Sequence, residues 1–216
     1  TLQAMDACID HLSALSGVAA ETAAMDAHPG YLSRRLGHAR GGTECTIEIQ
    51  HHHAHAASLM AEAGRSGSEP IIAFVFDGTG YGADGSLWGG EVLLTDYQRS
   101  ERWGHLENVQ LPGGDAAVAN PCRTALAHLS AAGLSWDDDL APVRACEGAE
   151  RAVLARQLST GMGCVATSSV GRLFDAVGSL LDLRHRITYE AQAAIDLEAL
   201  AAAHLQPLAE ADHRHP

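Results

Sequence analysis

The chain has 216 residues, 46% hydrophobic and 19% charged, enough to bury a sizeable core in one large domain or two small ones. Its formal net charge of −13 argues against binding a bare nucleic-acid backbone, which needs a basic surface. All 14 basic residues are arginine, which excludes mechanisms that need a lysine of this chain, such as a Schiff base. No apolar run approaches the roughly 20 residues of a membrane span, so we expect no membrane contact.

Apolar spacing and turn residues predict the elements of the first half. Periods of 3.6 and 2 indicate helices and strands, and glycine and proline mark the breaks between them. The continuous apolar run over 71–76 predicts a strand that is buried on both faces. In chain order, we expect a helix over 2–15, breaks at 28–30 and 40–42, a strand over 45–49, a helix over 51–63, a strand over 71–76, a glycine-rich turn over 77–85, and antiparallel strands over 87–94 and 97–106.

The second half changes character after Pro112-Gly113-Gly114. Segments rich in Ala and Leu have helical spacing, and no internal repeat is visible. The chain is therefore expected to be a mixed α/β protein. The predicted helices cover 115–132, 147–158, 170–183 and 189–205.

Five cysteines are scattered along the chain and never form a C-x-x-C pair. This usage favours buried, reduced thiols in a cytoplasmic protein over a disulfide framework.

Four histidines gather in the segment His51-His52-His53-Ala54-His55, where a predicted strand ends and a helix begins. Residues four apart share a helix face, so His51 and His55 should point the same way. Two imidazoles one turn apart can chelate a divalent transition metal. A polar helix start with exposed histidines is the alternative reading.

A glycine-rich segment, 76–82, follows the apolar strand. We expect Asp77 at the end of that strand, where its carboxylate could bind a metal ion. The backbone N–H groups of 78–82 could contact a phosphate. A tight turn that needs positive φ at Gly80 or Gly82 explains the glycines equally well.

Several blocks together resemble the Kae1-like domain of HypF carbamoyltransferases of [NiFe]-hydrogenase maturation. The resemblance extends from about residue 20 to 202. The blocks are Gln50-His51-His52-His53-Ala54-His55-Ala56-Ala57, Phe76-Asp77-Gly78-Thr79-Gly80-Tyr81-Gly82, Leu87-Trp88-Gly89-Gly90-Glu91, Leu111-Pro112-Gly113-Gly114-Asp115-Ala116-Ala117, Asn120-Pro121, 167–177 and 189–194.

The resemblance implies an α/β, two-lobed actin/sugar-kinase/Hsp70-like (ASKHA) fold, incomplete at both ends. Residues 1–70 would be the end of the first lobe, with the histidine cluster. Residues 71–216 would be the start of the second lobe, a strand hairpin followed by helices. We expect no acylphosphatase, zinc-finger or YrdC-like domain in this chain, and no later Gly-Gly-rich segment with its metal-binding aspartate. The usual glycine of Tyr-Glu-Gly-Gln is Ala191 here.

The resemblance also implies a site. One divalent transition metal, zinc or iron, would be bound by His51, His55 and Asp77, and Asp77 would be the catalytic residue. The adenine nucleotide of carbamoyl adenylate would lie against five further residues: Gly78, Gly80, Gly171, Asp175 and Glu190.

The implied reaction uses carbamoyl phosphate and ATP. A YrdC-like domain would make carbamoyl adenylate from them, and the Kae1-like domain would pass the carbamoyl group to the C-terminal cysteine of a HypE-like partner. O-carbamoylation of a small-molecule hydroxyl and a non-catalytic metal- or nucleotide-binding remnant are the alternatives. The tRNA threonylcarbamoyl reading is weaker, because its His-x-Glu-Gly-His pattern is replaced by His-His-His-Ala-His.

Overall fold

A computed structural model describes residues 1–41 and 45–204, which form two compact units. Unit 1 holds Thr1–Val75, Gly80–Ser86 and Glu91–His105. Unit 2 holds Phe76–Thr79, Leu87–Gly90 and the described residues from 106 to 204. Two strands contribute residues to both units, so these units differ from the lobes expected at 1–70 and 71–216, whose assignment stays a prediction.

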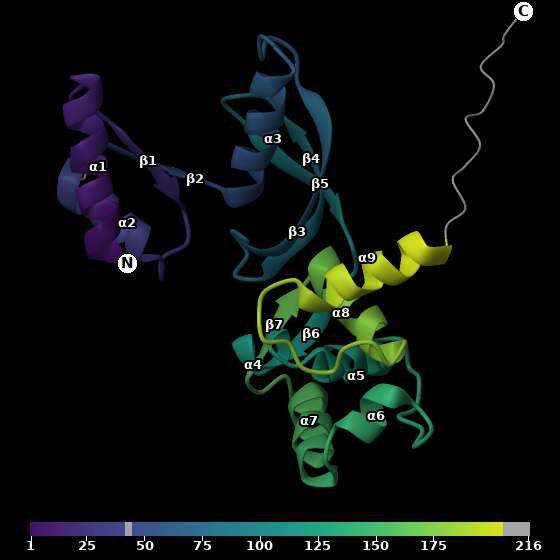
Figure 1. Cartoon of the computed structure of the whole chain (residues 1–216). Helices are drawn as coiled ribbons and strands as arrows, with labels where there is room; N and C mark the ends of the chain where they lie inside the picture. The colour runs from purple at the N-terminus through teal and green to yellow at the C-terminus, as the bar shows by residue number, and fades with distance from the viewer. Residues whose placement is uncertain (42–44, 205–216) are drawn as a thin grey trace, which may run out of the picture. The chain divides into compact units, whose positions relative to one another are not determined.

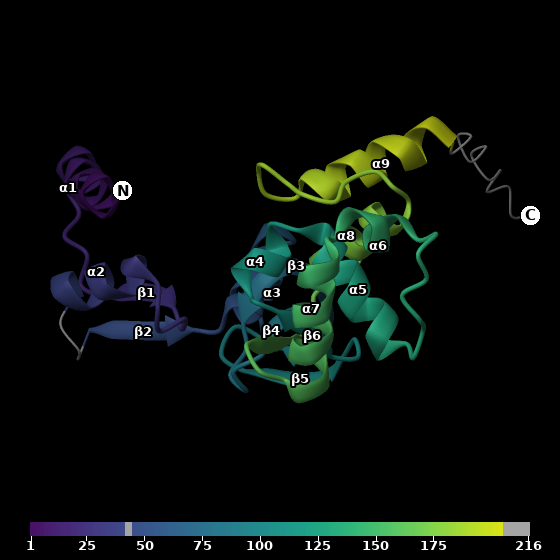
Figure 2. The same cartoon turned by 90° about the horizontal axis from the view of Figure 1, so that it is seen from below.

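Unit 1 begins with a helix and a small parallel sheet. Strands β1 and β2 pair in parallel, and α2 lies beside them (Figure 2). Helix α1 ends at Gly17, whose φ of 66° is the left-handed conformation common after a helix. The elements are α1 (Leu2–Ser16), β1 (Ala23–Asp26), α2 (Leu32–Gly41), β2 (Thr46–Ile49) and α3 (His51–Glu62).

The helices over 2–15 and 51–63 and the strand over 45–49 are confirmed. Strand β1 and helix α2 are additions that the sequence analysis did not anticipate. The break expected at 40–42 is wrong at Arg40 and Gly41, which belong to α2, and Gly42 lies outside the described residues.

The longest strand, β3 (Ile71–Tyr81), begins at the predicted residue but is not buried on both faces. Its burial alternates: Ala73 and Val75 are buried, whereas Phe74 and Phe76 are 69% and 64% exposed in the described structure. The strand also runs through Asp77 and Gly78 up to Tyr81, so the predicted turn over 77–85 shrinks to its last residues. There, the N–H of Gly82 donates to Ser86 O (3.0 Å).

Strand β4 (Leu87–Thr95) pairs antiparallel with β5 (Ser100–His105), as predicted. The larger sheet has the order β3-β4-β7-β6, with β5 paired to β4. Strands β6 (Val109–Pro112) and β7 (Cys164–Thr167), antiparallel to each other, were not predicted.

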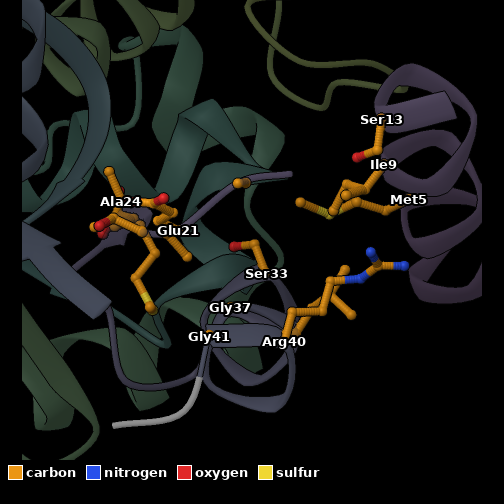
Figure 3. A pocket seen from close by; sticks show the side chains of 15 residues that line it. Met5, Ile9, Ser13, Glu21, Ala24, Ser33, Gly37, Arg40 and Gly41 are labelled. Carbon is orange, nitrogen blue, oxygen red and sulfur yellow. The ribbon is translucent and has the colours of Figure 1, made fainter. Parts of the chain in front are cut away.

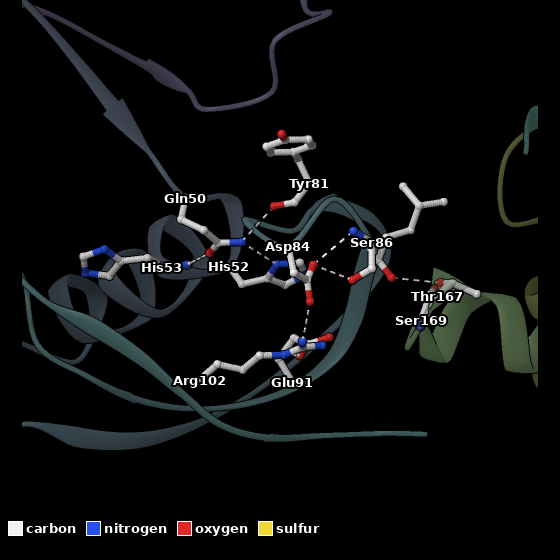
Figure 4. Close-up of polar contacts among 11 residues, drawn as sticks. Gln50, His52, His53, Tyr81, Asp84, Ser86, Glu91, Arg102, Thr167 and Ser169 are labelled. Carbon is white, nitrogen blue, oxygen red and sulfur yellow. Dashed lines mark hydrogen bonds and ion pairs between the residues drawn. The ribbon is translucent and has the colours of Figure 1, made fainter. Parts of the chain in front are cut away.

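A buried ion pair stabilises the strands of unit 1. Arg102 Nε donates to Glu91 Oε2 at 2.6 Å, and the Glu91 side chain is 0% exposed. Arg102 Nη1 also donates to Asp84 Oδ2 (2.9 Å), while Asp84 Oδ1 accepts from the Ser86 N–H (3.0 Å) (Figure 4). The turn and the two neighbouring strands are thus joined by one polar network.

Unit 2 is mainly helical, and three of its helices pack on β6. Helix α8 lies beside α5 and α9 (Figure 1). The core of unit 2 combines Cys122, Leu126 and Leu129 of α5 with Val143 of α6, its C-cap residue Cys146, and Leu154 of α7. The helices are α4 (Asp115–Val118), α5 (Pro121–Ala131), α6 (Ala141–Ala145), α7 (Gly148–Thr160), α8 (Val170–Leu180) and α9 (Gln192–His204).

The predicted helices of this half are confirmed in their central parts, with the first split into α4 and α5, and with α6 added. Helix α8 ends at Leu180 instead of 183, α9 begins at Gln192 instead of 189, and residue 205 lies outside the described residues. All five cysteines are free thiols, but Cys8 and Cys45 are exposed, so burial holds only for Cys122 and Cys146 in full. In the described chain, no helix is both long and apolar enough to span a membrane.

Candidate functional site

The histidine cluster lies where strand β2 passes into helix α3. Gln50 is the N-cap of α3, and its side-chain oxygen accepts the N–H of His53 (2.9 Å). This cap satisfies one of the unpaired donors of the first turn and starts the helix at His51. The side chains of the first turn are thereby fixed relative to the strand end.

His51 and His55 share one face of α3, as their spacing predicts. Their Nε2 atoms lie 3.2 Å apart. Two imidazole nitrogens on one tetrahedral zinc ion, each about 2.0–2.1 Å from it, are about 3.3 Å apart. The two ring nitrogens are therefore already spaced as a pair of ligands to one divalent ion.

The two middle histidines have other contacts. His52 is 0% exposed and its Nδ1 lies 3.2 Å from Gln50 Nε2, which donates also to Tyr81 O (3.1 Å) (Figure 4). His53 Nε2 lies 2.8 Å from Asp96 O, a carbonyl that accepts its proton. Because His52 and His53 contact other segments, only His51 and His55 of this run lie on the shared face of α3.

Asp77 lies within β3, not at the end of a strand as predicted. Its Oδ1 accepts the N–H of Gly78 at 2.6 Å. The following residues are extended rather than looped, so the N–H groups of 78–81 do not form the phosphate-binding turn expected from the glycines. The sequence could not distinguish these cases, because alternating glycines fit a turn and a tightly packed strand equally well.

Four of the five predicted nucleotide residues line one cavity of unit 2. Gly78, Gly171, Asp175 and Glu190 surround a space of about 380 Å³, together with Asp77. A volume of this size falls within the range of about 300–1,000 Å³ for small-molecule sites. The structure therefore brings together residues that are more than 100 positions apart in sequence.

Gly80 does not line this cavity. It belongs to unit 1, where a Cβ added to it would lie 2.1 Å from Cε1 of His52. Close packing on the buried His52 ring is thus sufficient to require a glycine at this position. A nucleotide role for Gly80 has no geometric support in the described structure.

A buried ion pair on α8 faces the same cavity. Arg172 Nη2 lies 2.9 Å from Asp175 Oδ2, and the residues are 4% and 0% exposed. Within the described chain, Arg172 Nε and Nη1 and Asp175 Oδ1 have no hydrogen-bond partner. Burial raises the pKa of Asp175 to about 6, although the Arg172 charge acts in the opposite direction.

Arg172 and Glu190 also line a second cavity of about 370 Å³, with Thr79, Asp115 and Thr188 among its other residues. Sequence reasoning did not single out Arg172 or Asp115. An arginine among the apolar residues of a helix was the signal available for Arg172, since a charge in such a pattern needs a partner when buried.

Ala191 lies beside the first cavity with a left-handed backbone, φ +61°. This conformation costs little for glycine and about 1–2 kcal/mol for other residues. The geometry accounts for a glycine at this position in the motif that Tyr189-Glu190-Ala191-Gln192 resembles.

A further cavity, of about 650 Å³, lies in unit 1 between α1 and the β1–α2 segment (Figure 3). Met5 and Ile9 contribute apolar surface to it, and the Arg40 guanidinium is bound to Asp6 and to Asp10 (2.7 Å). None of the residues predicted for the metal or nucleotide lines it.

A mixed five-stranded sheet packed with helices makes this an α/β protein, and the histidine pair at the start of α3 is consistent with a partial ASKHA-like fold. Two family models extend this to a specific family. The model "HypF Kae1-like domain" matches residues 1–62, and "Carbamoyltransferase, Kae1-like Domain, second subdomain" matches residues 73–214. The chain belongs to the Kae1-like domain family of HypF carbamoyltransferases.

Relatives of known name agree with these matches. Carbamoyltransferase HypF of Rhodobacter capsulatus is 45% identical over 188 residues, 84% of this chain and 25% of that protein. Carbamoyltransferase HypF2 of Cupriavidus necator is 39% identical over 204 residues, 93% and 24% of the two chains. A HypF homolog from the same organism is 38% identical over 209 residues, 95% and 52% of the two chains.

Two solved structures have the same fold. Full-length HypF in its phosphate- and nucleotide-bound form matches with a TM-score of 0.79 and 36% identity, over 89% of this chain and 25% of that one. HypF of T. kodakarensis matches with a TM-score of 0.73 and 34% identity, over 84% and 25%. The chain thus spans only about a quarter of each HypF structure.

Proposed function

We propose that this chain performs carbamoyl transfer in [NiFe]-hydrogenase maturation, passing the carbamoyl group of carbamoyl adenylate to the C-terminal cysteine of a HypE-like partner. Carbamoyl adenylate would come from carbamoyl phosphate and ATP in a YrdC-like domain. The observation that carries the proposal is the His51–His55 pair, whose Nε2 atoms are 3.2 Å apart, in a chain of the HypF family.

His51, His55 and Asp77 are proposed as the ligands of one divalent transition metal, zinc or iron. The family match supports this set, and each of the three side chains can offer one ligand atom. Two imidazoles and a carboxylate form a donor set that suits both metals. When bound, such an ion would supply Lewis acidity at a carbonyl or phosphate oxygen.

The adenine nucleotide is proposed to bind in the unit 2 cavity lined by Gly78, Gly171, Asp175 and Glu190. Carboxylates at this position can accept hydrogen bonds from ribose hydroxyls. Calorimetry with AMP tests this part of the proposal. Glu190→Ala, at an exposed residue of the cavity, should weaken binding, and Glu147→Ala, at a residue that does not line the cavity, should leave it unchanged.

The transfer forms a carbon–sulfur bond and breaks the bond between the carbamoyl carbon and the phosphate oxygen, releasing AMP. The partner supplies the sulfur nucleophile as a thiolate, so no reactive cysteine of this chain is needed. Within this chain, the cavity residues would bind and orient the adenylate, and the walls of the cavity would limit its hydrolysis by water.

Metal content of the purified chain tests the ligand assignment. His51→Ala and His55→Ala should each remove most of the bound metal in elemental analysis. His53→Ala is the matched control, because His53 belongs to the same helix turn but contacts Asp96 O. His52 is a poorer control, since its buried ring packs on Gly80. Equal metal content in His51→Ala and the wild type contradicts the assignment.

Transfer activity requires a chimera, because the chain spans about a quarter of its relatives. The matching segment of Rhodobacter capsulatus HypF is replaced by this chain, and thiocarboxamide on HypE is followed by mass spectrometry. Asp77→Asn should leave carbamoyl-adenylate formation intact and reduce transfer on the order of 10²-fold or more. Asp138→Asn, at a side chain 93% exposed, is the control.

Transfer at the wild-type rate by Asp77→Asn would show that Asp77 has only a structural role in β3. A chimera that makes carbamoyl adenylate and transfers it to small-molecule hydroxyls, but not to HypE, would favour the O-carbamoyltransferase alternative.

A further inference from the structure

Asp26, a residue that no sequence motif singled out, lies next to the histidine pair. It is the last residue of β1 and pairs in parallel register with Ile49, the last residue of β2. The N–H of Ala27 continues this pairing by donating to Ile49 O (3.0 Å). Because α3 starts two residues later, the carboxyl ends of both strands bring Asp26 beside His51.

Both oxygens of the Asp26 carboxylate are engaged. Oδ1 accepts the backbone N–H of His28 at 2.7 Å, and Oδ2 lies 2.7 Å from His51 Nδ1. The side chains of Asp26 and His51 are 18% and 29% exposed, so water screens the contact only in part. The bond to His28 fixes the carboxylate, and the carboxylate then fixes the imidazole.

The contact determines where the His51 ring carries its proton. A carboxylate oxygen only accepts, so Nδ1 is the protonated nitrogen, and the lone pair of the neutral ring is on Nε2. Nε2 is the atom that lies 3.2 Å from His55 Nε2. In metal sites, a carboxylate on the outer nitrogen orients the ring and makes the inner nitrogen a better ligand.

We propose that Asp26 is a positioning residue of the metal centre, which sets the tautomer and the ring orientation of His51 for metal binding. The inference rests on the proposed metal role of His51. The competing explanation is that Asp26 only shapes the turn at His28-Pro29-Gly30 through its Oδ1 contact.

Asp26→Asn separates these two roles. The side-chain oxygen of asparagine can still accept the His28 N–H, which preserves the turn. Its amide group then faces His51 Nδ1 as a donor, which requires Nδ1 to accept and moves the ring proton to Nε2. The expected result is zinc affinity reduced about 10- to 100-fold, measured by competition with a chromophoric chelator.

Asp10→Asn is the control, because it makes the same substitution at a carboxylate that contacts Arg40 (2.7 Å) and not His51. Zinc affinity should be unchanged in this variant. Long-range ¹H–¹⁵N NMR spectra of the metal-free protein report the His51 tautomer directly. We expect protonated Nδ1 in the wild type and protonated Nε2 in Asp26→Asn.

Three outcomes separate the inference from the proposed function. If His51→Ala loses zinc while Asp26→Asn binds it as the wild type does, Asp26 has no positioning role and the metal site stands. Protonated Nε2 on His51 in the metal-free wild type also overturns the inference, even if Asp26→Asn does not fold. If His51→Ala binds zinc normally, the proposed metal site itself is wrong.

Discussion

Each of the two units contains an arginine paired with a buried carboxylate, and the two pairs differ in how completely they are bonded. In unit 1, Arg102 reaches both Glu91 and Asp84. In unit 2, Arg172 reaches Asp175, and several of their polar atoms have no hydrogen-bond partner among the described residues. The first pair ties strands together, whereas the second faces a cavity.

The difference indicates two roles: the Arg102–Glu91 pair stabilises the fold, and the Arg172–Asp175 pair lies at a candidate binding site. A buried ionic group that forms all its hydrogen bonds stabilises one conformation. When some of these hydrogen bonds are missing, the group is less stable, and a bound ligand that supplies the missing partners can restore that free energy. Burial also raises the pKa of Asp175 to about 6. The predictions below test the contrast, starting with the largest expected change.

Glu91→Leu should destabilise the protein most. It removes the fully buried carboxylate that accepts from Arg102 Nε at 2.6 Å, while the Arg102 side chain is itself only 17% exposed. Breaking a buried pair in this way costs about 3–5 kcal/mol of unfolding free energy. Urea denaturation of the 216-residue chain measures it. A cost below about 1 kcal/mol would mean that the network in Figure 4 does not stabilise the hairpin.

Asp175→Asn should change the pH dependence of stability. Because the folded-state pKa is raised above its usual value near 3.8 to about 6, the native chain keeps a proton between pH 4 and 6 that the unfolded chain releases. Stability from this group therefore falls as pH rises through that window, by about 3 kcal/mol at most. The variant lacks the group, so the difference between the two urea-denaturation profiles isolates its contribution.

A profile of Asp175→Asn parallel to that of the wild type between pH 4 and 6 would contradict this prediction. Glu48→Gln provides a control of opposite sign. The Arg34 hydrogen bond lowers the pKa of the Glu48 carboxyl, so its contribution is lost as pH falls rather than as it rises.

Gly171→Ala should destabilise unit 2 by about 1–3 kcal/mol. A Cβ on Gly171 would lie 2.7 Å from the Cα of Gly78, a backbone atom that cannot turn away. Gly148→Ala is the matched control, because nothing lies within 4 Å of its added Cβ. Equal stability of the two variants would show that the α8–β3 contact yields easily.

The sequence predicted the features that depend on local spacing and missed those that depend on packing. The i, i+4 spacing was sufficient to predict that His51 and His55 share one face, since both are on one helix. It could not find Asp26, whose position depends on the register between β2 and β1, a four-residue strand that the sequence did not predict. Only the family resemblance predicted that Gly78 lies near Asp175 and Glu190, because no periodic pattern in the sequence connects segments so far apart.

Ala191→Gly should produce the smallest change, and a stabilising one. Ala191 has φ +61°, and its carbonyl accepts the N–H of Ile195 (2.9 Å) at the start of α9, so the strained backbone is held in place. Glycine removes a left-handed penalty of about 1–2 kcal/mol but gives the unfolded chain about 0.4–1 kcal/mol more conformational entropy. The expected net gain in unfolding free energy is below about 1 kcal/mol.

Ala194→Gly is the control: Ala194 lines the same cavity from within α9, where glycine costs about 1 kcal/mol relative to alanine. If the unfolding free energy rises in Ala191→Gly and falls in Ala194→Gly, the gain comes from the left-handed backbone of Ala191. A loss of stability in both would contradict the prediction and indicate that the Ala191 methyl group packs favourably beside the cavity.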